Sequence, residues 1–230
     1  MGVAGLQRLP ETTVIVGLML ESASPRLLRV GEAHWKAPDK VPSIRLRTIE
    51  SAGQLSMAFT TGILMGIGET IEERVDALLA IHEANRKYGH IQEVIVQPFR
   101  VKPDIRMSGS PEPSNDELER TIAVARLIFG GEMNLQSPPN LLLQDYPDLL
   151  KAGINDWGGI SPVTKDFINP EAAWPQISSL AARSASAGFE LRERLAIYPE
   201  FSRKPGFLNA RLEPLVRNSQ DKNSYARQGV

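Results

Sequence analysis

Residues 60–70 of the chain, TTGILMGIGET, place three glycines and a carboxylate where an apolar run meets the start of a predicted helix. Glycine weakens a strand but lets another group approach its backbone closely. The N–H groups at the start of the helix point toward the same place. We expect Gly66 and Gly68 to let a flat ligand approach the backbone closely. We expect the Glu69 carboxylate to accept a hydrogen bond from an amine or hydroxyl group of that ligand. A phosphate loop is disfavoured, because no Gly-Lys-Ser/Thr follows and because Glu69 and Glu72 would repel phosphate.

Polar or glycine-rich residues also follow the other predicted strands. These clusters begin at Glu21, Gln97, Gln136 and Asn155, and the last of them extends to Ser161. Because parallel strands bring their carboxyl ends to one edge of a sheet, the clusters predict a single ligand-binding rim. The alternative for each residue is a role in a cap or a turn.

The histidines offer no metal site. His34, His82 and His90 are scattered and show none of the spacings that are typical of metal ligands. His82 lies on the apolar face of a predicted helix and is interpreted as a packed residue, and His90 as a turn residue that caps the end of that helix. His34 lies in the loop after the first predicted strand and is a candidate for the rim. The chain contains no cysteine, which excludes disulfides, thiolate metal ligands and thiol nucleophiles.

Length and composition are those of one globular domain. The chain has 230 residues, of which 42% are hydrophobic, and a net charge of −1. We expect a single domain over residues 1–217 and a polar C-terminal tail over 218–230. The near-neutral charge disfavours nucleic acid as a partner.

Residues 14–20 are interpreted as a strand rather than as part of a signal peptide, because Glu11 and Glu21 flank them closely. No apolar run is long enough to span a membrane, and we expect a cytoplasmic protein.

Short apolar runs alternate with segments of helical periodicity. The predicted strands cover residues 13–20, 57–65, 91–97, 133–136 and 154–157. The predicted helices cover residues 43–52, 70–88, 114–129, 145–151 and 175–187. Gly53 and Gly89 are expected to end the first two helices. This alternation predicts an α/β fold with a parallel sheet of about five β/α units and with its helices on one side, which suits part of a closed barrel or an open sheet.

Two helices carry clear start signals and apolar stripes. Thr70 with Glu73, and Ser114 with Glu117, match the capping box. The predicted stripes consist of Val75, Leu78, Leu79 and His82 in the first helix, and of Leu118, Ile122, Ala125 and Phe129 in the second. Both helices are therefore expected to pack one face against the sheet.

Six segments of the chain resemble a known family. They are GLMLES at 17–22, AHWKAPDK at 33–40, FTTGILMGIGET at 59–70, YGHIQEVIVQPF at 88–99, SPPNL at 137–141 and DWGGISPVTKDFINPE at 156–171. Together they resemble subunit 1 of 7,8-didemethyl-8-hydroxy-5-deazariboflavin (FO) synthase, a radical S-adenosylmethionine (SAM) enzyme. The spacing of Gly62, Leu64, Gly66 and Glu69 is also similar to the radical SAM motif GxIxGxxE, which lies along the adenine of SAM.

The resemblance implies a (β/α)8-type barrel, of which this chain would form about five β/α units. In that family a [4Fe-4S] cluster held by three cysteines cleaves SAM to a 5′-deoxyadenosyl radical. The substrate is the adduct of tyrosine and 5-amino-6-(D-ribitylamino)uracil, which a partner, FO synthase subunit 2 or a fused second half, produces. Ring closure with loss of ammonia makes the enzyme a lyase.

The resemblance also implies the site residues. Those expected around SAM are Glu21, Gly62, Leu64, Gly66, Gly68 and Glu69. Those expected around the substrate are His34, Thr61, Gln97, Gln136, Asn140, Asp156, Trp157 and Ser161. No residue of the chain is assigned as a catalytic group or as a metal ligand.

The absence of cysteine is the main departure from the family. The family's CxxxCxxC motif follows its first barrel strand, and no such motif exists in this sequence. The chain then corresponds to the C-terminal part of the enzyme, with three strands and the cluster loop expected in a missing N-terminal barrel segment. We expect this chain alone not to perform the chemistry, because an iron–sulfur cluster depends on thiolate ligands.

Two other functions stay open. The first is a cysteine-free substrate-binding or scaffold subunit that has no catalysis of its own. The second is a cluster-independent barrel enzyme such as an aldolase-like lyase, which needs a Schiff-base lysine at a strand end. Lys102 and Lys165 both follow strands by several residues, which is a poor position for that role.

Overall fold

The computed structural model describes residues 3–142, 146–161 and 163–227, and its centre is a parallel sheet. The sheet consists of β1 (Val16–Gly17), β2 (Phe59–Met65), β3 (Ile91–Pro98) and β4 (Asn134–Gln136). The four strands lie in the order of the sequence, so that each pairs with its neighbour along the chain. The predicted α/β class with a parallel sheet is confirmed. The expected fifth strand is present only as one parallel bridge, between Gln136 and Asp156.

The first strand is shorter than predicted because one extra residue interrupts its pairing with β2. Leu18 N donates to Thr60 O, and the next backbone bond to β2 comes from Glu21 N to Gly62 O. Between them, Leu20 N donates instead to the Thr61 hydroxyl at 3.2 Å. Such a bulge ends the regular ladder and changes the direction of the side chains that follow.

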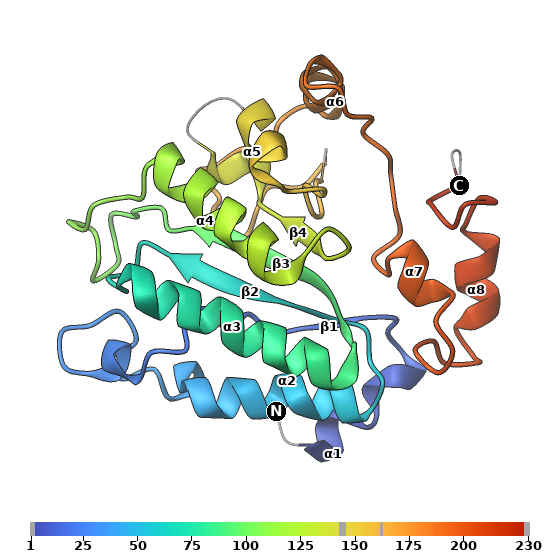
Figure 1. Cartoon of the computed structure of the whole chain (residues 1–230), viewed down its shortest axis with the longest axis horizontal. Coiled ribbons are helices and arrows are strands. Elements are labelled where there is room, and N and C mark those ends of the chain that lie inside the picture. Colours follow the sequence, from blue (N-terminus) through green and yellow to red (C-terminus); the bar gives the residue numbers. More distant parts are fainter. Residues whose placement is uncertain (1–2, 143–145, 162, 228–230) are drawn as a thin grey trace.

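Three long helices cover one face of the sheet, as expected. α2 (Pro42–Gln54), α3 (Ile71–Tyr88) and α4 (Asn115–Phe129) lie side by side in Figure 1. Both predicted capping boxes are present, and Gly89 ends α3 in the left-handed conformation with φ of 60°. Gly53, however, does not stop α2, which continues to Gln54. A Cβ on Gly53 would lie 2.6 Å from the Tyr88 ring, so this glycine allows α2 and α3 to pack closely.

The main core lies between these helices and the sheet. In α4 the predicted stripe is confirmed, with Leu118, Ile122 and Ala125 buried. In α3 the buried stripe consists of Ala77, Leu78, Ile81 and Ala84, whereas the predicted Leu79 is 46% exposed. The buried stripe is therefore rotated from the predicted one and includes two alanines, which the predicted pattern of large apolar residues at helical spacing passed over.

The remaining helices are short. They are α1 (Val3–Leu6), α5 (Tyr146–Ala152), α6 (Ile177–Ser186), α7 (Pro199–Ser202) and α8 (Glu213–Asn218). The predicted start of α5 at Asp145 lies outside the described residues. Sequence patterns did not indicate α7 and α8, which lie together at one end of the sheet in Figure 1. Beyond α8, Gln220 forms a bridge with Ala226 and donates to the Ser202 hydroxyl at 2.9 Å. In the described part of the chain, no helix is long and apolar enough to cross a membrane.

His90 is a buried residue of the core rather than a turn residue at the end of α3. Its side chain is fully buried, Nε2 lies 2.9 Å from Ile49 O, and its ring contacts Phe59 and Tyr88. Burial disfavours the charged imidazolium and lowers the pKa of His90 to about 4.

This burial predicts a pH dependence of stability. Below the ordinary pKa of 6.5 the unfolded chain binds a proton at His90, whereas the folded chain stays neutral there until about pH 4. The free energy of unfolding should therefore fall as the pH drops through this window, by at most about 1.4 kcal/mol per pH unit from this group. Urea denaturation of the chain and of His90→Phe at pH 7, 5.5 and 4.5 measures the effect. An equal slope in both proteins would contradict it.

Candidate functional site

The register of the sheet sorts the predicted site residues onto two faces. Residues that pair across parallel strands point to the same side. Thr61, Val94 and Leu135 form one row, and Val94 and Leu135 pack in the core with the helices. Rows alternate between the two sides of the sheet, so the rows of Gly62 and Leu64 lie on the side away from the helices, which is the open face of the sheet. They hold five of the predicted residues, which are Gly62, Leu64, Gln97, Gln136 and Asp156.

Thr61 is not part of this open face. Its side chain is fully buried, and its hydroxyl accepts the hydrogen bond from Leu20 N that forms the bulge of β1. The strand period of two puts Thr61 opposite its neighbours Gly62 and Thr60. The structure thus gives Thr61 a place between β1 and β2 and does not bring it to the other candidates.

The chain itself occupies the space beside two glycines of the 60–70 stretch. A Cβ on Gly62 would lie 2.1 Å from Ile95 O of β3, and one on Gly66 would lie 2.6 Å from the Pro113 ring. Gly66 and Gly68 also have φ values of 88° and 93°, which side chains rarely tolerate. Strand pairing and the turn conformation therefore explain these glycines without a ligand.

Glu69 is likewise used within the chain. Its carboxylate accepts hydrogen bonds from Gly66 N at 2.9 Å and from Ile67 N at 2.8 Å, and Arg74 pairs with it at 2.7 Å. Its side chain is only 2% exposed. The expected bond from Glu69 to a ligand is not what this geometry favours, because the carboxylate closes the turn that contains the glycines.

Arg26 holds the same turn from outside. Its guanidinium donates to Gly68 O at 2.6 Å and pairs with Glu73 at 2.7 Å and Glu32 at 3.0 Å. The hydrogen bond from Arg26 holds the pKa of Glu73 at about 2, so this carboxylate stays ionised. Nothing in the sequence pattern singled out Arg26, because Gly68 and Glu73 lie 42 and 47 residues further along the chain.

Glu21 lies at the centre of a charged cluster at the end of β1. His34 Nε2 lies 3.1 Å from one carboxylate oxygen, Arg45 lies 3.1 Å from the other, and Lys40 binds the same oxygen as Arg45. Burial acts to raise the pKa of Glu21, but hydrogen bonds from His34 and Lys40 and the charges of Lys40 and Arg45 lower it to about 2. Glu21 also has a positive φ of 65°, so the backbone turns sharply at this residue.

The structure thus brings together two predicted residues, Glu21 and His34. It adds two positively charged residues, Lys40 and Arg45, which the sequence did not indicate for this site. Arg45 could have been found, because it lies at the apolar spacing of α2 with the buried Ile49 and Ala52. A buried arginine on such a stripe requires an acidic partner. His34 is 5% exposed, and its Nδ1 has no hydrogen-bond partner in the described part of the chain.

The segment after β4 is held by the block that follows Asp156. Gln136 Nε2 donates to Trp157 O at 3.4 Å, and Asn140 Nδ2 donates to Asp166 at 3.0 Å. Ser161 has a turn role, since its hydroxyl accepts bonds from the amide and the hydroxyl of Thr164.

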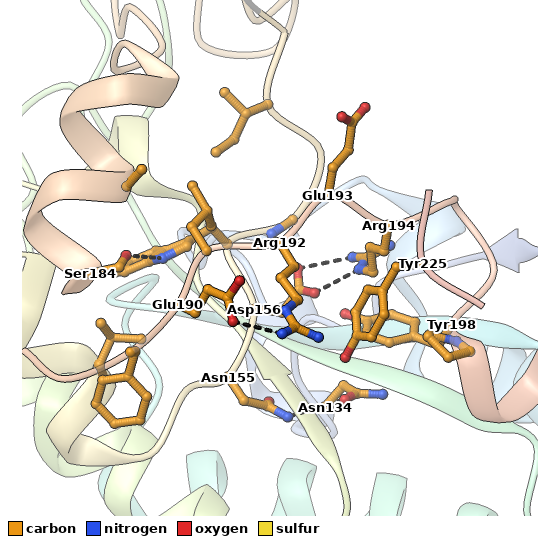
Figure 2. Close-up of a pocket in the computed structure, with 18 of the residues that line it drawn as sticks. Asn134, Asn155, Asp156, Ser184, Glu190, Arg192, Glu193, Arg194, Tyr198 and Tyr225 are labelled. Atoms are coloured by element: carbon orange, nitrogen blue, oxygen red, sulfur yellow. Dashed lines mark hydrogen bonds and ion pairs between the residues drawn. The ribbon is translucent and has the colours of Figure 1, made fainter. Parts of the chain in front are cut away.

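A cavity of about 540 Å³ opens beside Asp156 and Trp157. Much of its lining comes from α6 and from residues 189–194 of the segment before α7, and Asp156 and Trp157 are the predicted substrate residues that line it. Figure 2 shows Asp156 paired with Arg194, at 2.6 and 2.9 Å. Trp157 is 5% exposed, and its indole donates to the Ser184 hydroxyl at 3.3 Å.

Arg194 links Asp156 to a second buried carboxylate, Glu93 of β3. Arg194 lies 3.1 Å from Glu93 and stacks on the Tyr198 ring, and the Tyr198 hydroxyl donates to Glu93 at 2.8 Å. Burial raises the pKa of Glu93, and the negative charge of Asp156 acts in the same direction. Glu93 lies inside an apolar strand, and this position alone indicated that it has a charged partner. No sequence pattern indicated that the partner is Arg194, about 100 residues away.

A [4Fe-4S] cluster does not fit the residues of this chain. The sequence has no cysteine, and the described residues contain no group of three or more His, Asp or Glu side chains placed to hold a metal ion. Cluster ligation depends on thiolates. The ligands of any cluster at this site must therefore come from outside these 230 residues.

Comparisons with known proteins give a consistent set of relatives. FO synthase of Streptomyces coelicolor is 52% identical over 212 residues, which is 91% of this chain and 24% of that protein. The 7,8-didemethyl-8-hydroxy-5-deazariboflavin synthase of Methanopyrus kandleri is 47% identical over 222 residues, or 96% of this chain and 66% of that protein. The synthase of the same name from Methanothermobacter thermautotrophicus is 49% identical over 204 residues, or 87% and 62%. The chain therefore spans about a quarter of the first relative and less than two thirds of the others. No protein-family model matches the chain.

Proposed function

We propose a role in FO synthesis for this chain, which belongs to the 7,8-didemethyl-8-hydroxy-5-deazariboflavin (FO) synthase family. The observation that carries the proposal is identity of 47% or more with these three synthases over nearly the whole chain. Such identity makes a shared fold and shared site positions the simplest explanation for the polar residues on the open face of the sheet.

In this proposal the sheet is part of the wall of a (β/α)8-type barrel. Parallel strands in sequence order with helices on one face are what a barrel wall requires. β1 is the first strand of the sheet order, and in the described residues only β2 pairs with it. An unpaired edge of this kind is suited to accept a further strand. The proposed partner at this edge is a barrel segment outside these 230 residues, which also carries the cluster-binding cysteines.

The proposed reaction is the radical SAM lyase step that closes the FO ring system with loss of ammonia. SAM, when bound beside the cluster, supplies the group that abstracts hydrogen. The proposed SAM-lining residues are Glu21, Gly62, Leu64, Gly66 and Gly68. Of these, the first is the one whose ionised carboxylate is only partly enclosed, with 12% of its side chain exposed, and it suits a sugar hydroxyl. Glu69 supports this site by fixing the turn after β2.

The proposed substrate is the tyrosine adduct of a ribityl-substituted uracil. Gln97 and Gln136 on the open face are neutral donors and acceptors, which suit a polyol and an imide. FO synthase subunit 2, or a fused second half, is the proposed source of this substrate.

A second function follows from the lack of cluster ligands. A chain without cysteine can serve as a substrate-binding or scaffold subunit of the same pathway without its own catalysis. This alternative predicts substrate binding by the chain, but no FO when a cluster-bearing segment is added.

Anaerobic reconstitution distinguishes the two functions. The chain is mixed with a separately expressed barrel segment that carries CxxxCxxC, together with iron, sulfide, SAM, reductant and substrate, and FO is detected by its fluorescence. The proposal expects FO only when both polypeptides are present. A segment in which the three cysteines are alanines is the matched control. If no FO forms, while a full-length synthase makes it under the same conditions, the proposed enzymatic role is wrong.

A further inference from the structure

A loop that connects β3 to α4 covers the carboxyl end of the open face. The loop consists of residues 101–112 and extends beyond the tip of β2 in Figure 1. Three of its apolar side chains pack in one cluster with Leu64 of the open face and with Ile67, which lies in the turn after β2. These side chains are those of Val101, Ile105 and Met107. The loop therefore lies over the part of the sheet that carries the predicted SAM residues.

The two ends of the loop are held together firmly. Glu112 accepts a hydrogen bond from Val101 N at 2.7 Å and pairs with Arg100 at 3.4 Å. The Arg100 side chain is only 10% exposed and also donates to Pro113 O at 3.2 Å. A compact loop with its ends close together and its own side chains packed beneath it is an Ω-loop, a type that frequently carries function.

The far end of the loop is held by two basic side chains at the surface. Arg106 donates to Trp35 O at 2.8 Å and lies 5.5 Å from the centre of the Trp35 ring. Lys102 donates to Ile168 O. Beyond these contacts the tip is free, since a Cβ on Gly109 would meet no other part of the chain within 4 Å. Contacts at the surface each contribute little to stability, so the tip can leave the open face while the ends of the loop stay together.

The two basic side chains bind segments that hold different parts of the predicted site. The first bond reaches the residue after His34, whose Nε2 lies 3.1 Å from Glu21. The second reaches Ile168, whose N–H donates to Asp166, the partner of Asn140. The loop thus connects the charged cluster at the end of β1 with the segment after β4.

We propose that residues 101–112 form a lid over the open face, which Arg106 and Lys102 hold closed and whose tip opens to admit and release small molecules. The joined ends of the loop act as the hinge. A closed lid of this kind excludes water and retains a reactive intermediate until the reaction is complete. That the enclosed molecules are SAM and the tyrosine adduct rests on the proposed function.

Thiol labelling of the whole chain tests the opening of the lid. Because the chain has no cysteine, a single introduced thiol reports on one place. Met107→Cys puts that thiol on the packed side of the lid, and Met57→Cys puts it in the main core, where the native side chain is 5% exposed. Adding Arg106→Met removes the hydrogen bond to Trp35 O but keeps much of the length of the side chain.

Loss of this hydrogen bond should raise the labelling rate of Met107→Cys about three- to tenfold and leave that of Met57→Cys unchanged. Arg120→Met is the matched control, since the Arg120 side chain is 81% exposed and pairs with Asp116 within α4. An unchanged rate for Met107→Cys would overturn the proposal, because Arg106 would then not hold the loop. An equal rise at Met57→Cys would also overturn it, because the whole chain would then be unfolding.

Product ratios in the reconstituted two-polypeptide enzyme test what the lid encloses. Arg106→Met should lower the amount of FO formed per 5′-deoxyadenosine at least threefold, with the rate of 5′-deoxyadenosine formation within twofold of wild type, because intermediates escape or are quenched. A purely structural role would lower both products together. An unchanged ratio in an enzyme whose lid labels faster would overturn the proposal. If the wild-type system makes no FO, the proposed function fails, whereas the labelling rates still decide whether residues 101–112 open as a lid.

Discussion

Replacing Glu21 by Gln is expected to lower the free energy of unfolding at pH 7 by about 3 kcal/mol, the value that corresponds to a carboxyl pKa lowered from 4.5 to about 2. The physical reason is the loss of the only carboxylate within salt-bridge distance of Lys40 in the described residues, and of the closest one to the buried Arg45. Glutamine still accepts a hydrogen bond, but Lys40 then has no carboxylate partner among the described residues, and Arg45 has only the exposed Asp39 at 3.6 Å.

The pH dependence separates this charge effect from a simple packing defect. The pKa of Glu21 is depressed in the folded chain, so its contribution is complete above pH 4.5 and is lost as the pH falls toward 2. The difference between wild type and Glu21→Gln in guanidinium denaturation should therefore be large at pH 7 and smaller at pH 3. Glu50→Gln is the control, because Glu50 is an exposed partner of Lys87 at 4.0 Å. A difference that stays constant with pH would show that the charge is not the cause.

Arg194→Met should destabilise the chain by about 3 to 5 kcal/mol, the usual result of removing one partner of a buried charge pair. Methionine keeps much of the length of the side chain but leaves Glu93 and Asp156 without their shared cation. Without Arg194, the charge of Asp156 adds to burial in raising the pKa of Glu93 in the folded chain. The variant therefore loses stability as the pH rises. The difference in free energy of unfolding between wild type and variant should shrink as the pH falls from 7 toward 4.5, the ordinary pKa of a glutamate.

Arg192→Met provides the matched comparison for Arg194→Met. Arg192 lines the same cavity, but its side chain is 50% exposed and pairs with Glu190 at 2.7 Å near the surface. Urea denaturation of both variants at pH 7 and pH 5 measures the two effects. If Arg194→Met is no less stable than Arg192→Met, the buried network does not hold residues 194–198 against the sheet.

Local rules predicted the parts of the fold that depend on few residues. Both capping boxes and the left-handed Gly89 follow from side chains within one helical turn, and the structure has them. The parallel order of β2, β3 and β4 follows from the alternation of strands and helices. In contrast, the bulge before Glu21 depends on a bond from Leu20 to Thr61 across two strands, which no local pattern contains.

The candidate site was predictable in part for the same reason. Strand ends indicated Gln97, Gln136 and Asp156, and the register places all three on one face. The glycine pattern was read as an opening for a ligand, although Ile95 and Pro113 fill the space beside Gly62 and Gly66. Sequence spacing cannot distinguish a close approach by a ligand from one by the chain itself.

Long-range pairing explains the residues that were missed. Arg194 acts on Glu93 and Asp156 from a segment without helical or strand periodicity, so its sequence neighbours carried no signal of the pairing. Arg26 reaches Glu73 and Gly68 from a short turn in a similar way. A charged residue in an apolar pattern, such as Glu93 or Arg45, indicates that a partner of opposite charge exists. It does not identify which residue that partner is.

The central proposal is that this chain forms part of the FO synthase active site and that the cluster ligands come from a segment outside these 230 residues. Iron content and 5′-deoxyadenosine production, measured together after anaerobic reconstitution, test it most directly. The chain alone should hold no stoichiometric [4Fe-4S] cluster and make no 5′-deoxyadenosine, because it has no thiolate. Addition of the cysteine-bearing barrel segment should restore both. A chain that binds four irons and makes 5′-deoxyadenosine by itself would contradict the claim.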